Sequence, residues 1–464
     1  MNKHRNTSNT TAPNGRRGFL RLGAAAPLAL AAAPFAGPAV AQDRSGDLWA
    51  ADRWVGTWGA SPTGAAISPQ PAPKELTNQT LRQIVHTSIG GNRVRVCFSN
   101  EFGTTPLTIG AAHVARRTTG SSIDPASGRV LTFGGQPSIV IPPGAPALSD
   151  PVDLDLPALV DLAISIYLPQ PATATTLHGS AFQTNYIVAG NAAGAPTLAG
   201  ASTTTSWHFL SGVSVWTGRA GAIVTLGDSI TDGAVTTVDA NRRWPDILSL
   251  RLRQYDRLFR LGVVNAGIGG NRLLNPGNAT IGSFEGIGPL FGPAALARFD
   301  RDVLAQPGVE AVIVLLGVND LGQPVSISPA SEEVSEPALL QGYRQLIARA
   351  REKSLNIYGA TITPFGDTTI AGYFTTAREA IRQAVNNWIR SSGEWDGVID
   401  FDAAVRDPAN PARMLPAYDS GDHLHPNDAG MVAMSQSIPL RMLTDILRLS
   451  GAPDMPRAAL AAWG

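Results

Sequence analysis

From Gly221 onward, short apolar runs alternate with longer amphipathic patterns. The apolar runs are rich in β-branched residues and read AIVTLG, GVVNAG, EAVIVLLG, LNIYGATI and GVIDF. Runs this short, separated by segments with helical periodicity such as ALLQGYRQLIARAREK, are typical of strands in βαβ units. The sequence therefore predicts an α/β fold in which helices cover both faces of a buried parallel sheet.

The preceding part of the chain, residues 42–220, follows a different pattern. In NRVRVCFSN and LAISIYL every second residue is apolar, a period that indicates strands with one buried face and one less buried face. Turn and breaker signals such as GG, PPG, SDP and LPQPA lie between such runs. We therefore expect a β-sandwich or jelly-roll-like domain over 42–220, followed by the α/β domain over 221–464.

The first 41 residues form a third segment. They contain five lysines and arginines and no acidic residue, and GRRGFLRL is followed by an alanine-rich run that ends in Ala39-Val40-Ala41. This pattern predicts a cleaved signal peptide, and the arginine pair is typical of twin-arginine export. Prolines interrupt the apolar run, which disfavours a membrane span. The mature protein is expected in the periplasm or outside the cell, with no stable membrane anchor.

Charge and cysteine content narrow the function classes. Without residues 1–41 the chain keeps 31 lysines and arginines against 36 acidic residues, with no basic run, which argues against a nucleic-acid partner. Cys97 is the single cysteine, so no intramolecular disulfide can form. Export of an already folded protein would explain a secreted chain without disulfides. The position of Cys97 in an alternating run predicts a packed strand residue and not a nucleophile.

Residues that directly follow the predicted strands are candidates for a functional site, because ligands of such sheets bind beyond the carboxyl ends of the strands. The first strand ends in Gly-Asp-Ser at 227–229, the second in NAGIGGN at 265–271, and the third in Gly-Val-Asn-Asp at 317–320. DSGDHLHPND, at 419–428, precedes the last predicted helix. Taken singly, each is a common turn, loop or cap.

Together these residues fit the hydrolysis of an ester by a serine enzyme. Ser229 would be the nucleophile, His425 the base that takes and returns its proton, and Asp422, three residues earlier, the acid that orients the imidazole. The backbone N–H groups of Ser229 and Gly270 and the side-chain amide of Asn319 would bind the oxyanion.

Several alternatives stay open at this stage. His423 competes with His425 as the base, and Gly267 competes with Gly270 as the oxyanion glycine. Asp228 and Asp320 adjoin the candidate residues and are interpreted as loop-ordering groups. Ser420 also follows an aspartate but no buried strand, and is rejected as nucleophile. A metal-dependent hydrolase using Asp422 and the two histidines ranks lower, because few other ligands occur in suitable contexts.

Four sequence blocks carry a family resemblance. LGDSITDG, VVNAGIGGN, LLGVNDL and DHLHP occur in this order within residues 222–447, which resemble the SGNH hydrolases, also called the GDSL esterase/lipase family. The resemblance implies a flavodoxin-like three-layer α/β/α sandwich with five parallel strands and no cofactor. It also implies the triad Ser229, His425 and Asp422, with Asn319 and Gly270, five residues after Asn265, in the oxyanion hole.

The expected activity is hydrolysis of a carboxylic ester through an acyl-enzyme. Export and the β-rich domain favour short-chain acyl esters or carbohydrate and plant-derived esters. A lipid-directed, lysophospholipase-like esterase and a binding protein that has kept an esterase fold are the alternatives. Four tryptophans of the β-rich domain either stack on sugars or belong to its core: Trp54, Trp58, Trp207 and Trp216. The acidic segment 322–337 is either a pocket wall or a surface loop.

Overall fold

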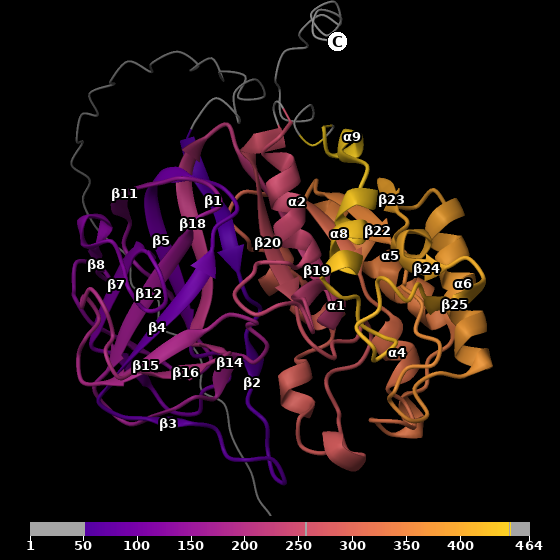
Figure 1. Ribbon diagram of the computed structural model, residues 1–464, viewed down its shortest axis with the longest axis horizontal. Coiled ribbons are helices and arrows are strands. Elements are labelled where there is room, and N and C mark those ends of the chain that lie inside the picture. Colours follow the sequence, from indigo (N-terminus) through magenta and orange to yellow (C-terminus); the bar gives the residue numbers. More distant parts are fainter. Residues whose placement is uncertain (1–51, 256–257, 445, 447–464) are drawn as a thin grey trace, which may run out of the picture. The chain divides into compact units, whose positions relative to one another are not determined.

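A computed structural model describes residues 52–255, 258–444 and 446. The predicted signal segment 1–41 lies outside the described residues. Figure 1 shows the β-rich region, 52–218, in indigo to magenta, and the α/β region, which starts at Gly221, in pink to yellow. Both regions belong to one compact unit. Within the described residues, no helix combines the length and apolar character needed to cross a membrane.

The α/β region contains a five-stranded sheet in the order β20-β19-β21-β22-β23, and every pair in it is parallel. The strands are β19 (Gly221–Gly227), β20 (Leu261–Gly267), β21 (Val309–Leu315), β22 (Asn356–Ala360) and β23 (Gly397–Ile399). Each of the five apolar runs singled out in the sequence thus contains a strand. The whole of β19 is buried, as its uninterrupted apolar character requires. The predicted parallel sheet is confirmed.

The helices fall into two packed groups. In one group α2 contacts α8, and in the other α5 contacts α3 and α6. This is the predicted three-layer arrangement. The helices are α1 (Ser229–Asp232), α2 (Trp244–Leu252), α3 (Ala295–Phe299), α4 (Val318–Gly322), α5 (Glu336–Glu352), α6 (Thr376–Ser391), α7 (Phe401–Val405), α8 (Asp428–Ser437) and α9 (Leu440–Leu443). Side chains cap the longest two, since Ser335 accepts from the N–H of Ala338 and Thr375 from that of Arg378.

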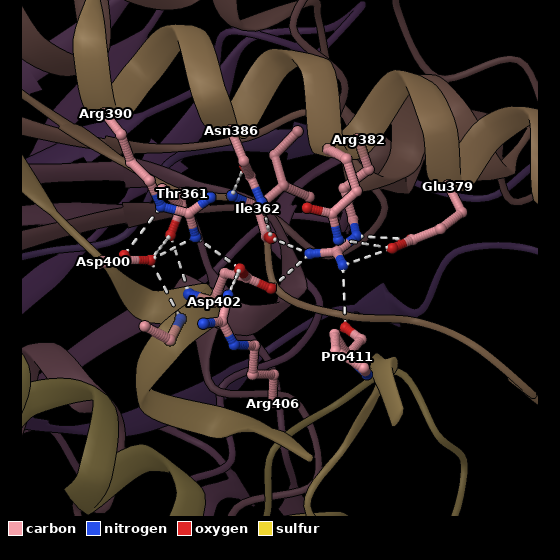
Figure 2. A network of polar contacts seen from close by, with 12 residues as sticks. Thr361, Ile362, Glu379, Arg382, Asn386, Arg390, Asp400, Asp402, Arg406 and Pro411 are labelled. Atoms are coloured by element: carbon pink, nitrogen blue, oxygen red, sulfur yellow. Dashed lines mark hydrogen bonds and ion pairs between the residues drawn. The ribbon is translucent and has the colours of Figure 1, made fainter. Parts of the chain in front are cut away.

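A network of ion pairs and hydrogen bonds joins α6 to the segments that follow β22 and β23. Figure 2 shows Asp402 among three arginines, and its carboxylate lies 2.6 Å from Arg382, 2.6 Å from Arg390 and 3.0 Å from Arg406. Arg382 is fully buried and also donates to Glu379 at 2.7 Å. Charges removed from water need such partners. The network therefore fixes the carboxyl end of this half of the sheet.

The β-rich region consists mainly of two antiparallel sheets whose buried side chains join one hydrophobic cluster. The first contains β1 (Asp52–Gly59), β18 (Leu210–Gly218), β5 (Gly91–Ser99), β10 (Pro146–Leu148) and β11 (Val152–Leu156). The second contains β16 (Ser202–Thr204), β15 (Asn185–Ala189), β4 (Gln79–His86), β12 (Asp161–Leu168), β7 (Ala111–Arg116) and β8 (Arg129–Leu131). The predicted β-rich antiparallel region is confirmed.

Small sheets of two or three strands complete the described β structure. They are formed by β2 (Thr63–Gly64), β14 (Thr176–His178) and β17 (Trp207–His208), by β3 (Glu75–Leu76) with β13 (Ala172–Thr173), by β6 (Leu107–Ile109) with β9 (Ile139–Ile141), and by β24 (Arg406–Asp407) with β25 (Asn410–Met414). Of these, β2 and β14 bring the β-rich region to the candidate site described below.

The alternation expected for β5 is observed, whereas β12 differs from its prediction. In β5, Val94, Val96 and Phe98 are buried, while Cys97 is only partly covered. In β12 the second face is buried as well, since Ala163 packs with Ile84 and Ala115, and Ser165 pairs with the buried Arg82 of β4. The Arg82 guanidinium donates to Ser165 of β12 at 2.9 Å and to backbone carbonyls of covering loops.

The four tryptophans of the β-rich region pack in two pairs. Trp58 and Trp207 are buried and make an edge-to-face contact with ring centroids 4.9 Å apart. Trp54 and Trp216 form a similar pair at 5.5 Å, and the Arg95 guanidinium lies 4.2 Å from the Trp54 ring centre. The first pair is therefore part of the core and is not free to stack on a sugar.

The β-rich region packs directly on the edge of the parallel sheet. Gly56 and Gly59 of β1 face Val264 of β20 so closely that a Cβ at either glycine would lie 2.7 Å or less from a Val264 methyl group. Gly56 also donates its N–H to the carbonyl of Pro307 at 2.8 Å. The glycines are needed because only a chain without side chains at these points can approach β20.

Candidate active site

Ser229 lies at the turn between β19 and α1, where the parallel sheet presents its carboxyl end. Asp228 caps the helix by accepting from the N–H of Ile230 at 3.0 Å, which makes Ser229 the first helical residue. The helix ends after one turn, because Gly233 adopts φ +94°. The N–H of Ser229 has no acceptor inside the helix at this position and remains available to a ligand.

The hydroxyl of Ser229 meets the imidazole of His425. Ser229 Oγ lies 2.8 Å from His425 Nε2, and His425 Nδ1 lies 2.6 Å from Asp422 Oδ2. The other carboxylate oxygen, Oδ1, accepts from the N–H groups of Leu424 and His425 at 2.9 and 2.8 Å and from the Ser420 hydroxyl at 2.9 Å. With an ionised Asp422, Nδ1 carries a proton and Nε2 is free to accept one from the serine.

The electrostatics of Asp422 favour its ionised form. Burial alone would raise the pKa of this carboxyl, but the hydrogen bond and charge of His425, together with the N–H groups of His425 and Leu424, outweigh it. The pKa of Asp422 consequently lies well below its usual range. An ionised Asp422 holds the imidazole in one tautomer and stabilises the imidazolium once the ring has taken a proton.

The structure separates the two histidines of this loop. His423 Nδ1 lies 2.6 Å from Asp419 Oδ2, and the His423 N–H donates to the same carboxylate at 3.1 Å. His423 thus pairs with a carboxylate of its own, while His425 contacts Ser229. Within the described part of the chain, no three or more His, Cys, Asp or Glu side chains are grouped as a possible metal site.

Residues 267–271 begin at the last residue of β20 and contain the predicted oxyanion glycine, and they are here called the oxyanion loop. Gly270 has φ +74°, and a Cβ there would lie 2.2 Å from the ring of Phe291. The N–H groups of Ile268, Gly269 and Asn271 are bonded within the protein. Among the described contacts of this loop, the N–H of Gly270 is the one without an acceptor. This distinguishes Gly270 from Gly267, whose N–H donates to the side chain of Asn265 at 2.8 Å.

Asn319 lies beside the oxyanion loop in α4, and its amide orientation is determined by two partners. Its Nδ2 donates to the carbonyl of Asn271 at 3.0 Å, and its Oδ1 accepts from the hydroxyl of Tyr373 at 2.5 Å. The tyrosine therefore turns the NH₂ side of the amide toward the loop. Nothing in the sequence around Tyr373 indicates this role, because the contact joins residues 54 positions apart.

Two buried carboxyls hold backbone segments next to the candidate residues, and among the described contacts neither forms a hydrogen bond with His425. Asp228 caps α1 as described, and Asp320 accepts from the N–H groups of Leu273 and Leu274 at 2.7 and 3.0 Å. Burial raises the pKa of Asp228 to about 7 and that of Asp320 to about 6. The interpretation of both as loop-ordering groups is confirmed by these contacts.

The raised pKa of Asp228 predicts a pH-dependent stability. The folded protein binds this proton more tightly than the unfolded chain, in which an aspartate titrates near about 3.9. The stabilisation is fully present below about pH 4 and is lost as the pH rises through about 7. Relative to Asp228→Asn, which keeps a side-chain oxygen for Ile230, the wild type should lose about 2–4 kcal/mol of unfolding free energy over this window. Urea unfolding of both proteins across this range measures the difference, and parallel curves would contradict it.

The acidic segment 322–337 is held against the loop after β20. The buried guanidinium of Arg272 donates to Ser328 at 3.2 Å and to Glu332 at 2.7 Å. Ile327 is buried and its carbonyl accepts from the N–H of Thr280 at 3.0 Å. The segment is therefore anchored and not a freely solvated loop, and its contribution to a substrate pocket stays a prediction.

The α/β region resembles a family of known proteins. Residues 225–433 match the model of the GDSL-like lipase/acylhydrolase family. Similar solved structures include a G-D-S-L lipolytic protein of Desulfitobacterium hafniense, with 20% identity over 47% of this chain and 96% of that chain and a TM-score of 0.33. A mutant acetylxylan esterase of Geobacillus stearothermophilus has 21% identity over 48% and 94% and a TM-score of 0.35. The aryl esterase of M. smegmatis has 15% identity over 48% and 99% and a TM-score of 0.36. Among curated proteins, no sequence matches this chain significantly.

Proposed function

We propose that Ser229, His425 and Asp422 carry out the hydrolysis of a carboxylic ester, the activity that the match of residues 225–433 to the GDSL-like lipase/acylhydrolase family supports. The observation that supports this assignment most strongly is the unbroken chain of contacts from the serine hydroxyl through both imidazole nitrogens to the carboxylate, at 2.8 and 2.6 Å. It joins residues 196 positions apart at the carboxyl end of a buried strand.

In the first half of the proposed reaction, Ser229 Oγ attacks the ester carbonyl carbon while its proton moves to His425 Nε2. The carbonyl oxygen becomes an oxyanion, which accepts hydrogen bonds from the N–H groups of Ser229 and Gly270 and the amide of Asn319. The intermediate then releases the alcohol, which takes the proton from His425, and the acyl group stays on Ser229.

In the second half, water attacks the acyl carbon. His425 now takes a proton from the water, the same three donors bind the second oxyanion, and Ser229 leaves as its hydroxyl when His425 returns the proton. Asp422 remains ionised throughout and stabilises the imidazolium in both halves. The carboxylic acid is the second product.

For the substrate, we propose a short-chain acyl ester outside the cytosol, carried by a carbohydrate or another plant-derived alcohol. The basic, alanine-rich sequence of residues 1–41 supports export, and the appended β-rich region favours a polymeric or carbohydrate ester over a lipid. A lysophospholipid and a non-hydrolysed ligand remain the competing outcomes of the test.

The test compares p-nitrophenyl esters of increasing acyl length with acetylated xylan and a lysophospholipid, using the chain without residues 1–41. We expect the highest kcat/KM for acetyl or propionyl esters and release of acetate from the xylan. A rate that rises with acyl length and with the lysophospholipid would overturn the substrate proposal. Binding without any hydrolysis would overturn the enzymatic one.

The contact between Tyr373 and Asn319 predicts a selective effect on kcat. Tyr373→Phe removes only the hydroxyl, so the Asn319 amide loses one of its two orienting partners. Because loss of a whole oxyanion donor lowers kcat by about 10²–10³, loosening one donor should lower kcat by about tenfold and leave KM nearly unchanged.

A matched control for this variant is Tyr343→Phe. The Tyr343 hydroxyl is also buried and donates to a backbone carbonyl, that of Leu316, at 2.8 Å. Both variants should lose comparable stability, but only Tyr373→Phe should lose kcat. Equal kcat values in steady-state assays of the two variants would show that Tyr373 does not orient the amide.

A further inference from the structure

A buried histidine of the β-rich region reaches the helix that carries the nucleophile. His178, at the end of β14, is 3% exposed, and its Nε2 lies 2.8 Å from Oδ1 of Asp232. Its Nδ1 lies 3.0 Å from the carbonyl oxygen of Ser61. With Asp232 ionised, both partners can only accept, and this geometry then fits an imidazolium with a hydrogen on each ring nitrogen.

The charges around this pair agree with that protonation state. Burial alone would lower the pKa of His178, but the carboxylate of Asp232 and the carbonyl of Ser61 raise it overall. Arg243 also faces the pair and acts in the opposite sense on His178. Its Nε donates to the backbone carbonyl of Asp232 at 2.8 Å, and its Nη2 donates to the carbonyl of Ala181.

Asp232 connects His178 to the oxyanion loop. It is the last residue of α1, three residues after Ser229, and its second carboxylate oxygen, Oδ2, accepts from the N–H of Gly269 at 3.1 Å. Gly269 directly precedes Gly270, whose N–H is the proposed oxyanion donor. The same carboxylate is therefore held on one side by the β-rich region and holds the oxyanion loop on the other.

A second connection runs in parallel through Arg298. Its fully buried guanidinium donates to the hydroxyl of Ser61 at 3.2 Å, to the carbonyls of Ala266 and Gly227 at 2.8 and 2.9 Å, and to the side chain of Asn271 at 3.0 Å. Ser61 thus contacts His178 through its carbonyl and Arg298 through its hydroxyl. The ends of β19 and β20 are tied to the β-rich region at this one residue.

We propose that the β-rich region takes part in catalysis, with His178 as a positioning residue that holds the oxyanion loop through Asp232. This inference rests on the proposed function. A small displacement of an N–H donor weakens the stabilisation of the transition state, because the donor must point at the oxyanion from a preorganised backbone. A buried ion pair adds little to stability compared with apolar packing, so the pair is better explained by the orientation that it imposes on the loop.

The test uses His178→Ala in the full chain, with His86→Ala as matched control. His86 belongs to the same region and also pairs with a carboxylate, Asp161, at 2.7 Å, but that carboxylate does not contact the oxyanion loop. With p-nitrophenyl acetate, His178→Ala should lower kcat about 10–100-fold and change KM less than about threefold. His86→Ala should keep kcat within about twofold.

Two additional measurements separate positioning from loss of structure. Thermal unfolding and titration of active sites with a phosphonate ester give the folded, reactive fraction, and kcat is calculated per reactive site. His178→Gln, whose amide can still donate to Asp232, should recover part of the kcat that is lost without the imidazole. This variant also keeps the inference testable if His178→Ala does not fold. A folded His178→Ala with the kcat of His86→Ala, or a His178→Gln no better than a folded His178→Ala, would overturn the inference.

The failure of the proposed function would look different. If the wild type and Ser229→Ala hydrolyse the ester at the same rate, the serine mechanism is wrong and the positioning role falls with it. If hydrolysis depends on Ser229 but not on His178, only the positioning role is overturned.

Discussion

Replacing Ser229 by alanine should lower kcat for p-nitrophenyl acetate by about three to four orders of magnitude or more. The variant keeps the oxyanion donors, because the N–H of residue 229 and those of Gly270 and Asn319 do not depend on the serine hydroxyl. It loses the atom that forms the acyl-enzyme, so any residual rate reflects water held near the same donors. Steady-state kinetics with both proteins measure the loss, and mass spectrometry tests for an acyl adduct in the wild type alone.

Ser391→Ala is a suitable control for this experiment. Ser391 lies in α6, and its hydroxyl donates to the carbonyl of Asn387 within the same helix. Both variants delete one hydroxyl, so any activity that is lost during expression and purification should be lost equally by both. If Ser229→Ala retained the activity of Ser391→Ala, the Gly-Asp-Ser turn would be structural and the binding-protein interpretation would take its place.

Replacing His425 by asparagine should have an effect of the same size. Without an imidazole at 2.8 Å from Ser229 Oγ, no group takes the serine proton during attack or returns it to the leaving alcohol. We expect kcat to fall by about three to four orders of magnitude, and the double variant with Ser229→Ala to fall little further, since the two residues act as a unit.

The neighbouring histidine provides the matched control. His423 is paired with Asp419 and has φ +59°, a conformation that asparagine tolerates well, so His423→Asn preserves the backbone. Its kcat should stay within about tenfold of the wild type, because its ring does not contact Ser229. If His423→Asn were inactive and His425→Asn active, the base would have to be His423 and not His425.

Much of the fold could be predicted from the sequence because its signals are local. Each of the five apolar runs of the α/β region contains a strand of the parallel sheet, and the alternation of β5 is visible in its nine residues. The prediction for β12 was incomplete because its second face is also buried, and there Ser165 accepts a hydrogen bond from Arg82 of β4, 83 positions away. A pattern within one strand carries no information on what packs across it.

The candidate site likewise has parts that the local sequence predicts and parts that it does not. The sequence by itself determined the contiguous parts: a serine at a strand end, glycines in the following loop, and an aspartate three residues before a histidine. Turn geometry, capping and the choice of glycine are decided by neighbouring residues, so these blocks are readable without a structure. The catalytic roles of Ser229, His425 and Asp422 stay predictions for the experiments above.

Only the tertiary structure decided which remote groups hold these parts in place. Tyr373 contacts Asn319, and His178 of the β-rich region reaches Asp232 in the helix that begins at Ser229. Arg298 joins the ends of two strands to Ser61. These partners come from separate segments and show no periodicity or spacing, because a buried polar group takes whichever partner the packing of distant elements brings within hydrogen-bond distance.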